Sequence, residues 1–312
     1  MKTVVIAIGG NSLIKDAQHQ SVSDQYAAVV ETVRHITDLL EQHYRIVITH
    51  GNGPQVGFIL LRSEHSRGVV HQVPLDSIVA DTQGALGYQL QQALENEFRR
   101  RRLKRSVVTI ITQTLVHRDD PAFAKPSKPI GEFYTREQAE ERMRVEQWTM
   151  AEDANRGWRR VVASPRPQRI IEADVVRHLV KDGYVVVAAG GGGIPVVADD
   201  QGMLSGVPAV IDKDLASAVL AGQIGADRLV IATSVNKVCL NFGQPGQKAL
   251  DEITVTQARQ FMAEGHFAAG SMLPKVEACV AFIQRGGREA VITSPADLSL
   301  ALDGESGTRF VP

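Results

Sequence analysis

The segment TVVIAI, residues 3 to 8, is a short run of apolar and mostly β-branched side chains that ends at two glycines. Five further runs of this kind are RIVIT (45–49), VVTIIT (107–112), YVVVAA (184–189), RLVIAT (228–233) and EAVIT (289–293). Such continuous apolar runs are typical of strands buried on both faces, as in a parallel sheet. The runs therefore predict the strands of one central sheet.

Longer segments between these runs have the spacing of helices that could cover the sheet. In residues 23–43, Ala27, Val30, Val33, Ile36 and Leu40 recur at steps of three and four residues and form one apolar stripe. Helical spacing also marks residues 77–102, 174–182, 213–225, 255–264 and 275–286. The alternation predicts an α/β fold, a three-layer αβα sandwich with a mostly parallel central sheet.

The segment 117–169 breaks this alternation because it is rich in proline, and we expect it to form a protruding lid subdomain. The 312 residues are otherwise expected to form one domain with two lobes.

The net charge and the lengths of the apolar runs indicate which kinds of binding partner the protein is not expected to have. The formal net charge is -1, with 44% hydrophobic and 22% charged residues, so no bulk attraction to nucleic acid or to a membrane surface is expected. No run approaches the roughly 18 apolar residues of a spanning helix, and the first apolar run is too short for a signal-peptide core. We expect a cytoplasmic protein with no nucleic-acid or membrane partner. The two cysteines, Cys239 and Cys279, are expected to be small buried side chains.

Three turns that leave predicted strands are rich in glycine: GGNS (9–12), HGNGPQVG (50–57) and GGGGIP (190–195). In open α/β sheets ligands lie beyond the carboxyl ends of the strands, where exposed backbone N–H groups suit an anion. Four consecutive glycines cost conformational entropy, so we expect something, preferably a ligand, to pack on their bare backbone.

Two common phosphate motifs do not fit these turns. The glycines at 51, 53 and 57 approximate G-x-G-x-x-G, but the spacing is one residue too long and the turn does not follow the first strand. The P-loop pattern G-x-x-x-x-G-K-[ST] does not occur in the sequence.

Three lysines have unusual neighbours. Lys128 lies among prolines, Lys275 follows the turn GSMLP, and Lys213 stands between Asp212 and Asp214 before a helical pattern. One of these aspartates is expected to cap the helix while the other orients the lysine. Lysines and backbone amides together suit the charge of a transferring phosphoryl group. No G-x-S-x-G elbow and no Cys/His pairing for hydrolase chemistry is apparent.

The motifs resemble those of the carbamate kinase family along almost the whole chain. The segments that carry the resemblance are AIGGNSL, THGNGPQVG, QGALGYQLQQAL, DPAFAKPSKPIGEFYT, RGWRRVVASPRP, GGGGIPVV, AVIDKDLASAVLA, NFGQPGQKAL and GSMLPKVEA. The resemblance implies the amino-acid kinase fold and reversible phosphoryl transfer between ATP and carbamate, giving ADP and carbamoyl phosphate. It also implies Mg²⁺ held mainly by the phosphates, with no metal-ligating side chains, and a homodimer that uses the QGALGYQLQQAL helix.

The resemblance also assigns roles to residues. Residues 1–205, with the lid, would form the acceptor-side lobe, and residues 206–312 the nucleotide-side lobe. Lys128, Lys213 and Lys275 would act on substrate and phosphates, with Asp214 holding the lysines in position. The groups implied to line the two substrates are Gly9, Gly10, Asn11, Gly51, Asn52, Gly53 and Gly190, Gly191, Gly192 and Gly193 for substrate and phosphate, and Thr233, Ser234, Phe242, Met272 and Pro274 for the nucleotide.

The chain departs from the family pattern at two places. It has TSVNKV (233–238) where familiar members have TDVDGV, and GSMLPK where they have GSMGPK. Ser234 and Asn236 thus replace two aspartates, and Leu273 replaces a glycine. Two alternatives to a carbamate kinase therefore stay open: a catalytically weak or silent nucleotide- or anion-binding paralogue, and a kinase of another small carboxylate.

Overall fold

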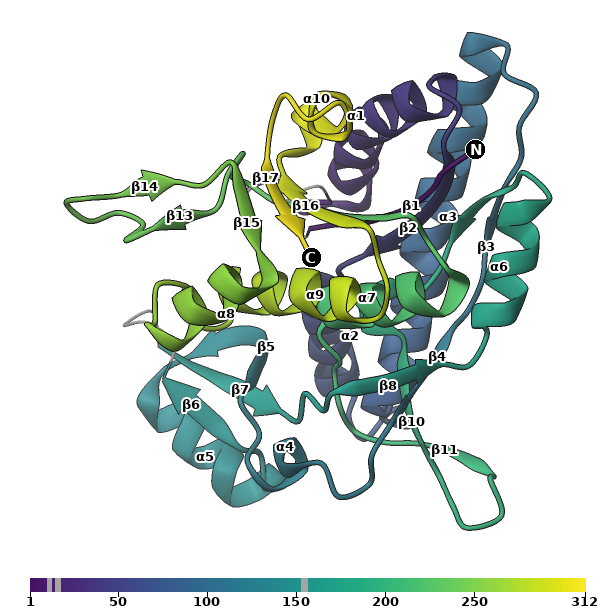
Figure 1. Ribbon diagram of the computed structural model, residues 1–312. Coiled ribbons are helices and arrows are strands. Elements are labelled where there is room, and N and C mark those ends of the chain that lie inside the picture. The colour runs from purple at the N-terminus through teal and green to yellow at the C-terminus, as the bar shows by residue number, and fades with distance from the viewer. Residues whose placement is uncertain (10–12, 15–17, 153–156) are drawn as a thin grey trace.

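The computed structural model describes residues 1–9, 13–14, 18–152 and 157–312, and its main body is a sheet covered by helices on both faces (Figure 1). The sheet has eight strands in the order β15-β17-β16-β12-β1-β2-β9-β3. Their bounds are β1 Thr3–Ile8, β2 Arg45–His50, β3 Val107–Thr109, β9 Val185–Val187, β12 Arg228–Ala232, β15 Glu252–Thr254, β16 Glu289–Thr293 and β17 Thr308–Val311. Only the β16–β17 pair is antiparallel, which confirms the predicted mostly parallel sheet.

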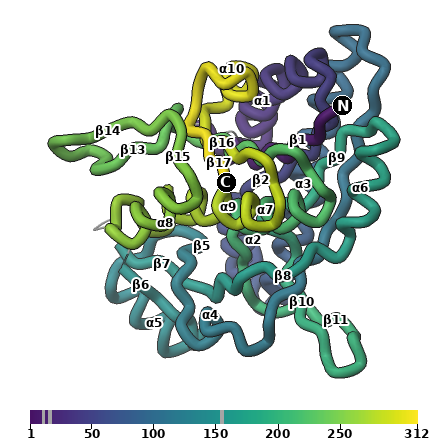
Figure 2. Tube along the Cα trace, in the orientation of Figure 1, coloured from purple at the N-terminus to yellow at the C-terminus, as the bar shows by residue number. Residues whose placement is uncertain are grey.

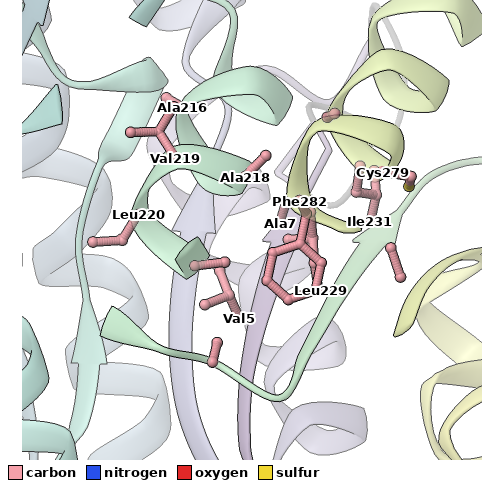
Figure 3. Packing of buried hydrophobic residues seen from close by; sticks show 14 of the residues in the cluster. Val5, Ala7, Ala216, Ala218, Val219, Leu220, Leu229, Ile231, Cys279 and Phe282 are labelled. Carbon is pink, nitrogen blue, oxygen red and sulfur yellow. The ribbon is translucent and has the colours of Figure 1, made fainter. Parts of the chain in front are cut away.

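Helices form the two outer layers, apart from the helices at 121–124 and 136–146, which belong to the segment predicted as a lid (Figure 1). The helices are α1 Val22–Glu41, α2 Gly53–His65, α3 Leu75–Arg101, α4 Pro121–Ala124, α5 Arg136–Glu146, α6 Ala173–Lys181, α7 Lys213–Ile224, α8 Val255–Ala263, α9 Met272–Gln284 and α10 Leu298–Leu302. Alternate residues of β1 face opposite layers, as the two-residue period of a strand requires. Val5 and Ala7 pack in a cluster with α7 and α9, and Figure 3 shows them beside Phe282 of α9. Ile6 and its neighbours pack against α1 and α3 on the other face.

The apolar stripe predicted for the first helix is partly wrong. Ser21 caps α1 through a capping box with Asp24, so the helix begins at Val22. Val33, Ile36 and Leu40 are buried as expected, but Ala27 is exposed and Val30 only half-buried. The other buried apolar residues of α1 are Ala28, Val29 and Leu39. The apolar spacing does not tell which of two adjacent stripes of α1 is buried. Packing against α3 decides which stripe is buried.

The strand predicted at 107–112 is shorter than expected. β3 ends at Thr109, and the chain then leaves the central sheet for a second sheet with the order β11-β10-β4-β8. The bounds of these strands are β4 Gln113–Val116, β8 Pro167–Ile170, β10 Ile194–Ala198 and β11 Leu204–Gly206. The Thr112 N–H donates to the Gln83 side chain, and the Thr112 carbonyl accepts from Ile194 N–H. These bonds turn the apolar run away from β9.

The segment predicted as a lid contains a small sheet of its own, together with α4 and α5. Its strands have the order β5-β7-β6, with bounds β5 Lys128–Tyr134, β6 Met150–Glu152 and β7 Trp158–Val162. β5 packs on α2, where a Cβ on Gly57 would lie 3.1 Å from Cα of Gly131. Ion pairs of Glu64 with Arg142 (3.3 Å) and of Arg67 with Glu146 also join α2 and the residues just after it to α5.

A second projection is the hairpin of β13 Cys239–Leu240 and β14 Lys248–Ala249, which extends from the body beside β15 (Figure 2). In the part of the chain that the structure describes, no helix is both long enough and apolar enough to cross a membrane.

Candidate active site

A buried charge cluster lies at the N-terminus of α7. Lys213 Nζ lies 2.6 Å from Asp214 Oδ1, and Lys275 Nζ, from the first turn of α9, lies 2.8 Å from Asp214 Oδ2. Asp214 is only 3% exposed, and each of its oxygens binds one ammonium group. Asp214 and Lys275 are 61 positions apart in the chain, and they meet because α7 packs along α9.

Electrostatics favour an anion in this cluster. Burial alone raises the pKa of Asp214, but the charges and hydrogen bonds of Lys213 and Lys275 outweigh it and lower that pKa to about 2. Burial also lowers the pKa of Lys213 below its ordinary value, although Asp214 opposes the shift. Two ammonium groups against one carboxylate leave one positive charge unbalanced in a buried place. A bound phosphoryl group would supply the missing negative charge and remove that penalty.

The third lysine reaches the same helix terminus from β5. Lys128 Nζ lies 3.2 Å from the Ile211 carbonyl and 3.5 Å from Asp212 Oδ2. Asp212 is also the N-cap of α7, since its Oδ1 accepts from Asp214 N–H and Leu215 N–H. The expectation that one aspartate caps this helix while the other holds the lysine is confirmed.

The second glycine turn (50–57) and the third (190–195) lie against each other beyond the carboxyl ends of β2 and β9. Asn52 precedes α2, is 3% exposed, and donates through Nδ2 to Thr82 Oγ1 at 2.8 Å. A Cβ on Gly191 would come within 2.0 Å of that same Nδ2. Gly53, by contrast, is exposed with open space around it, and Gly51 is half-buried.

The run of four glycines has a cause inside the protein. All four are buried, and Gly191, Gly192 and Gly193 have positive φ of 63°, 90° and 86°. The nearest atoms that added Cβ atoms would meet belong to His50, Asn52, Ile211 and Thr114, at 2.0 to 2.8 Å. The protein's own residues therefore cover this backbone, and no ligand is needed to explain the run. A role for Gly190, Gly191, Gly192 and Gly193 in substrate binding stays a prediction.

His50 is a residue of this region that sequence reasoning missed. It ends β2, is 1% exposed, and its Nδ1 lies 2.9 Å from the Gly51 carbonyl, so Nδ1 carries a proton. Burial, with a smaller contribution from the Lys213 charge, lowers its pKa to about 4 despite the bond to Gly51. A neutral ring therefore fills the space beside Gly190. Its position at the end of a strand, directly before a glycine turn, was the available signal.

A pocket of about 180 Å³ lies beside the carboxyl end of β12. Its lining residues are Thr233, Ser234, Val235, Lys237, Cys239, Phe242, His266, Phe267, Ala268, Ser271 and Met272. Four residues predicted for the nucleotide are among them, while the fifth, Pro274, is not and lies in the first turn of α9. Cys279 is buried as expected, but Cys239 is half-buried and lines the pocket.

Gly9, which follows β1, lies next to the end of β12 and so next to the pocket. A Cβ on Gly9 would lie 3.2 Å from the Ala232 carbonyl, so the end of β1 adjoins the residue before Thr233. Gly10 and Asn11, which were also predicted to line the phosphate region, lie outside the described residues.

The described side chains do not form a site for a protein-bound metal ion. Both oxygens of Asp214 are already bonded to lysines. Among the described residues, no group of three or more His, Cys, Asp or Glu side chains is placed to hold a metal. A metal ion in this region would therefore have to bring ligands of its own, such as phosphate oxygens.

The side chain of Leu273, in the first turn of α9, packs against the core and does not line the pocket. Its N–H donates to the Ala268 carbonyl at 3.1 Å, and the adjacent Met272 lines the pocket instead. We expect Leu273→Gly to lower the free energy of unfolding by about 2 kcal/mol, from lost burial and a poorer helix former. We expect the Kd for ADP to change less than about threefold. Urea unfolding and titration calorimetry check both, and a tenfold gain in ADP affinity would show that Leu273 restricts the pocket.

Comparison with known proteins gives consistent matches. The model of the amino acid kinase family matches residues 2–294. The carbamate kinase-like protein YahI of Escherichia coli (strain K12) is 50% identical over 99% of this chain and 98% of its own length. The carbamate kinase of Thermococcus kodakarensis is 46% identical over 100% of this chain and 99% of its own length. The structure of carbamate kinase from Giardia lamblia bound to AMP-PNP matches with a TM-score of 0.93 at 41% identity, over 99% of this chain and 98% of that one.

Proposed function

Because this chain belongs to the amino acid kinase family, among its carbamate-kinase-like members, we propose that it catalyses reversible phosphoryl transfer between ATP and carbamate. Transfer from ATP to carbamate gives ADP and carbamoyl phosphate. The observation that carries the proposal is the cluster of Lys213 and Lys275 on Asp214, with Lys128 at the same helix terminus.

The cluster suits a reaction that needs charge neutralisation rather than a nucleophilic side chain. The transferring phosphoryl group spreads negative charge over its oxygens, and ammonium groups held in place beforehand stabilise that charge. Carbamate is already an anion, so its oxygen can attack phosphorus without a general base. Lys213 and Lys275 then neutralise the phosphates, Asp214 keeps both in place, and Lys128 approaches from the lid side.

The pocket and the glycine turns support a proposal for where each substrate binds. The pocket that contains Thr233, Phe242 and Met272 is proposed to take the nucleotide base and ribose. The turns at Gly9 and at Gly51, Asn52 and Gly53 are proposed to face the carbamate and the transferring phosphate. Mg²⁺ is proposed to enter with the nucleotide, as part of the substrate, because the described residues provide no ligand set for it.

The test is formation of ATP from ADP and carbamoyl phosphate, measured with a coupled assay in the presence of Mg²⁺. The Lys213→Ala variant, with its fold checked by circular dichroism, serves as the inactive control. Turnover by the wild type well above that control supports the proposal. Equal rates for the two proteins would refute it.

Lys128→Ala is expected to lower kcat by about 100-fold while the Kd for ADP stays within about twofold. The reason is that Lys128 lies on the lid strand β5, is not among the residues that line the nucleotide pocket, and would act on charge in the transition state. Lys125→Ala is the matched control, since Lys125 is an exposed lysine of the same segment. Assays of turnover and calorimetry with ADP separate the two effects, and equal losses of both would assign Lys128 to nucleotide binding.

A catalytically silent nucleotide-binding protein is the second candidate. It is favoured by Ser234 and Lys237 in the pocket, where the family pattern has an aspartate and a glycine, and Lys237 is paired with Asp251. Calorimetry that finds ADP binding, together with no turnover above the Lys213→Ala control, would select this candidate.

A homodimer through α3 is also part of the proposal. Tyr88 lies on that helix and is 61% exposed, with Ile111 and Met203 exposed as well. Light scattering of the purified protein tests the assembly, and a Tyr88→Glu variant tests the surface.

A further inference from the structure

Asp212 connects the lid segment to the charge cluster. One of its oxygens, Oδ1, accepts from the Asp214 and Leu215 N–H groups at 2.9 and 3.3 Å. The other oxygen, Oδ2, lies 3.5 Å from Lys128 Nζ on β5. The carboxylate therefore contacts both the backbone that presents Lys213 and Asp214 and the lysine that comes from the lid.

Lys128 has a second contact at the same place. Its Nζ donates to the Ile211 carbonyl at 3.2 Å, one residue before the cap. The side chains of Lys128 and Asp212 are 27% and 26% exposed, so water only partly screens the pair. Three ammonium groups and two carboxylates, those of Asp212 and Asp214, thus surround the N-terminus of α7.

From this geometry, and resting on the proposed function, we propose that Asp212 is a positioning residue that holds the Lys128 ammonium at the α7 terminus for phosphoryl transfer. Without the carboxylate, Lys128 keeps its charge but loses its one charged partner at this terminus among the described residues, and only the Ile211 carbonyl still holds the ammonium. The site would also gain one net positive charge, which strengthens attraction for an anionic substrate. Loss of the Asp212 charge is therefore expected to lower kcat without raising KM.

A role in capping alone predicts something different. Asparagine caps helices about as well as aspartate, so Asp212→Asn keeps the bonds to the backbone of α7 and removes the charge that faces Lys128. If Asp212 were only a cap, this substitution would leave turnover nearly unchanged. Asp199→Asn is the matched control, because one Asp199 oxygen also accepts two backbone N–H groups, from Gln201 and Met203, in an exposed turn that contacts no lysine of the cluster in the hydrogen bonds and ion pairs of the described residues.

The kinetic test uses the full-length protein with ADP and carbamoyl phosphate. Asp212→Asn is expected to lower kcat about tenfold, with KM for carbamoyl phosphate unchanged or lower, whereas Asp199→Asn matches the wild type. In a Lys128→Met background, Asp212→Asn should change kcat by less than about twofold, because the ammonium group that Asp212 is proposed to position is absent. A kcat within twofold of wild type, or an equal loss in both backgrounds, would overturn the proposal.

A second measurement does not depend on turnover. Hydrogen exchange of the β5 amides, residues 128–134, is expected to be about threefold faster in ligand-free Asp212→Asn than in Asp199→Asn, with α7 unchanged. Unchanged exchange in β5 would show that Asp212 does not hold the lid lysine. If the wild type shows no turnover, the proposed function fails, and this exchange measurement still decides whether Asp212 positions Lys128.

Discussion

Asp214→Asn will lower kcat by about 10³-fold, which is the largest loss of activity that we expect from a single substitution. Asp214 is the only described carboxylate bonded to both Lys213 and Lys275, at 2.6 and 2.8 Å. The two ammonium groups lie on different oxygens of Asp214, so the asparagine oxygen would face one of them and the NH₂ group, which is a donor, would face the other. One lysine would therefore be displaced, and its charge would no longer meet the phosphoryl group.

The same substitution will lower the free energy of unfolding by about 3 kcal/mol at pH 7, because it removes the carboxylate bonded to two ammonium groups that are only 12% and 15% exposed. The folded-state pKa of Asp214, about 2, is lower than in an unfolded chain. Its contribution to stability is thus complete above about pH 4 and is lost as the pH falls from there toward 2. We expect the wild type to lose this stability in that range and Asp214→Asn to lack the corresponding change.

Asp38→Asn is the control, since Asp38 pairs with Arg101 at 2.6 Å but its side chain is 46% exposed. An exposed pair of this kind contributes little to stability. Urea unfolding at pH 7 and at pH 3, with kcat measured at pH 7, compares the two variants. Equal stability and activity of Asp214→Asn and Asp38→Asn would contradict the assignment of Asp214 as the common partner of the lysines.

Gly191→Ala is expected to have the second-largest effect, a loss of about 100-fold in kcat/KM together with about 3 kcal/mol of stability. The φ of Gly191 is 63°, and an added Cβ would lie 2.0 Å from Asn52 Nδ2 and 2.3 Å from its Cγ. Asn52 cannot move outward freely because it is buried and bonded to Thr82. The substitution would therefore shift the turn at 51–53, which we propose faces the substrate.

Gly202→Ala separates steric displacement from backbone strain. Gly202 has a φ of 80°, but nothing lies within 4 Å of an added Cβ, so only about 1 kcal/mol of strain is expected and activity should remain. Unfolding by urea and the coupled assay apply to both variants. If Gly191→Ala behaved like Gly202→Ala, the close packing of Asn52 on Gly191 would not matter for the reaction.

The strands of the central sheet could largely be predicted because burial on both faces imposes a local pattern. β1, β2 and β16 lie within one residue of the predicted bounds. The strand predicted at 107–112 is too long because the residues after Thr109 lead to β4 in a second sheet, and of these Ile110 is partly buried and Ile111 is exposed. Short strands such as β13 and β14 carry too few residues for any period to be visible.

The candidate site was only partly accessible to sequence reasoning. Asp214 and its lysines were named together because the motifs resemble a known family. His50 escaped notice because its importance comes from what surrounds it, namely the turn at Gly190 and the charge of Lys213. The run of glycines was noticed, but its cause was not, since the side chains that cover it come from β2, from the turn after it, from β4 and from the residues before α7.

The sequence by itself determined the α/β architecture, the mostly parallel sheet and the family, because strand runs, helical periods and motifs are properties of neighbouring residues. Only the tertiary structure decided that Lys213 and Lys275 share the two oxygens of Asp214, and that Asp212 reaches Lys128 across 84 positions of the chain. Such contacts depend on how α7, α9 and the lid strand pack, and packing brings together residues whose separation along the chain carries no local pattern.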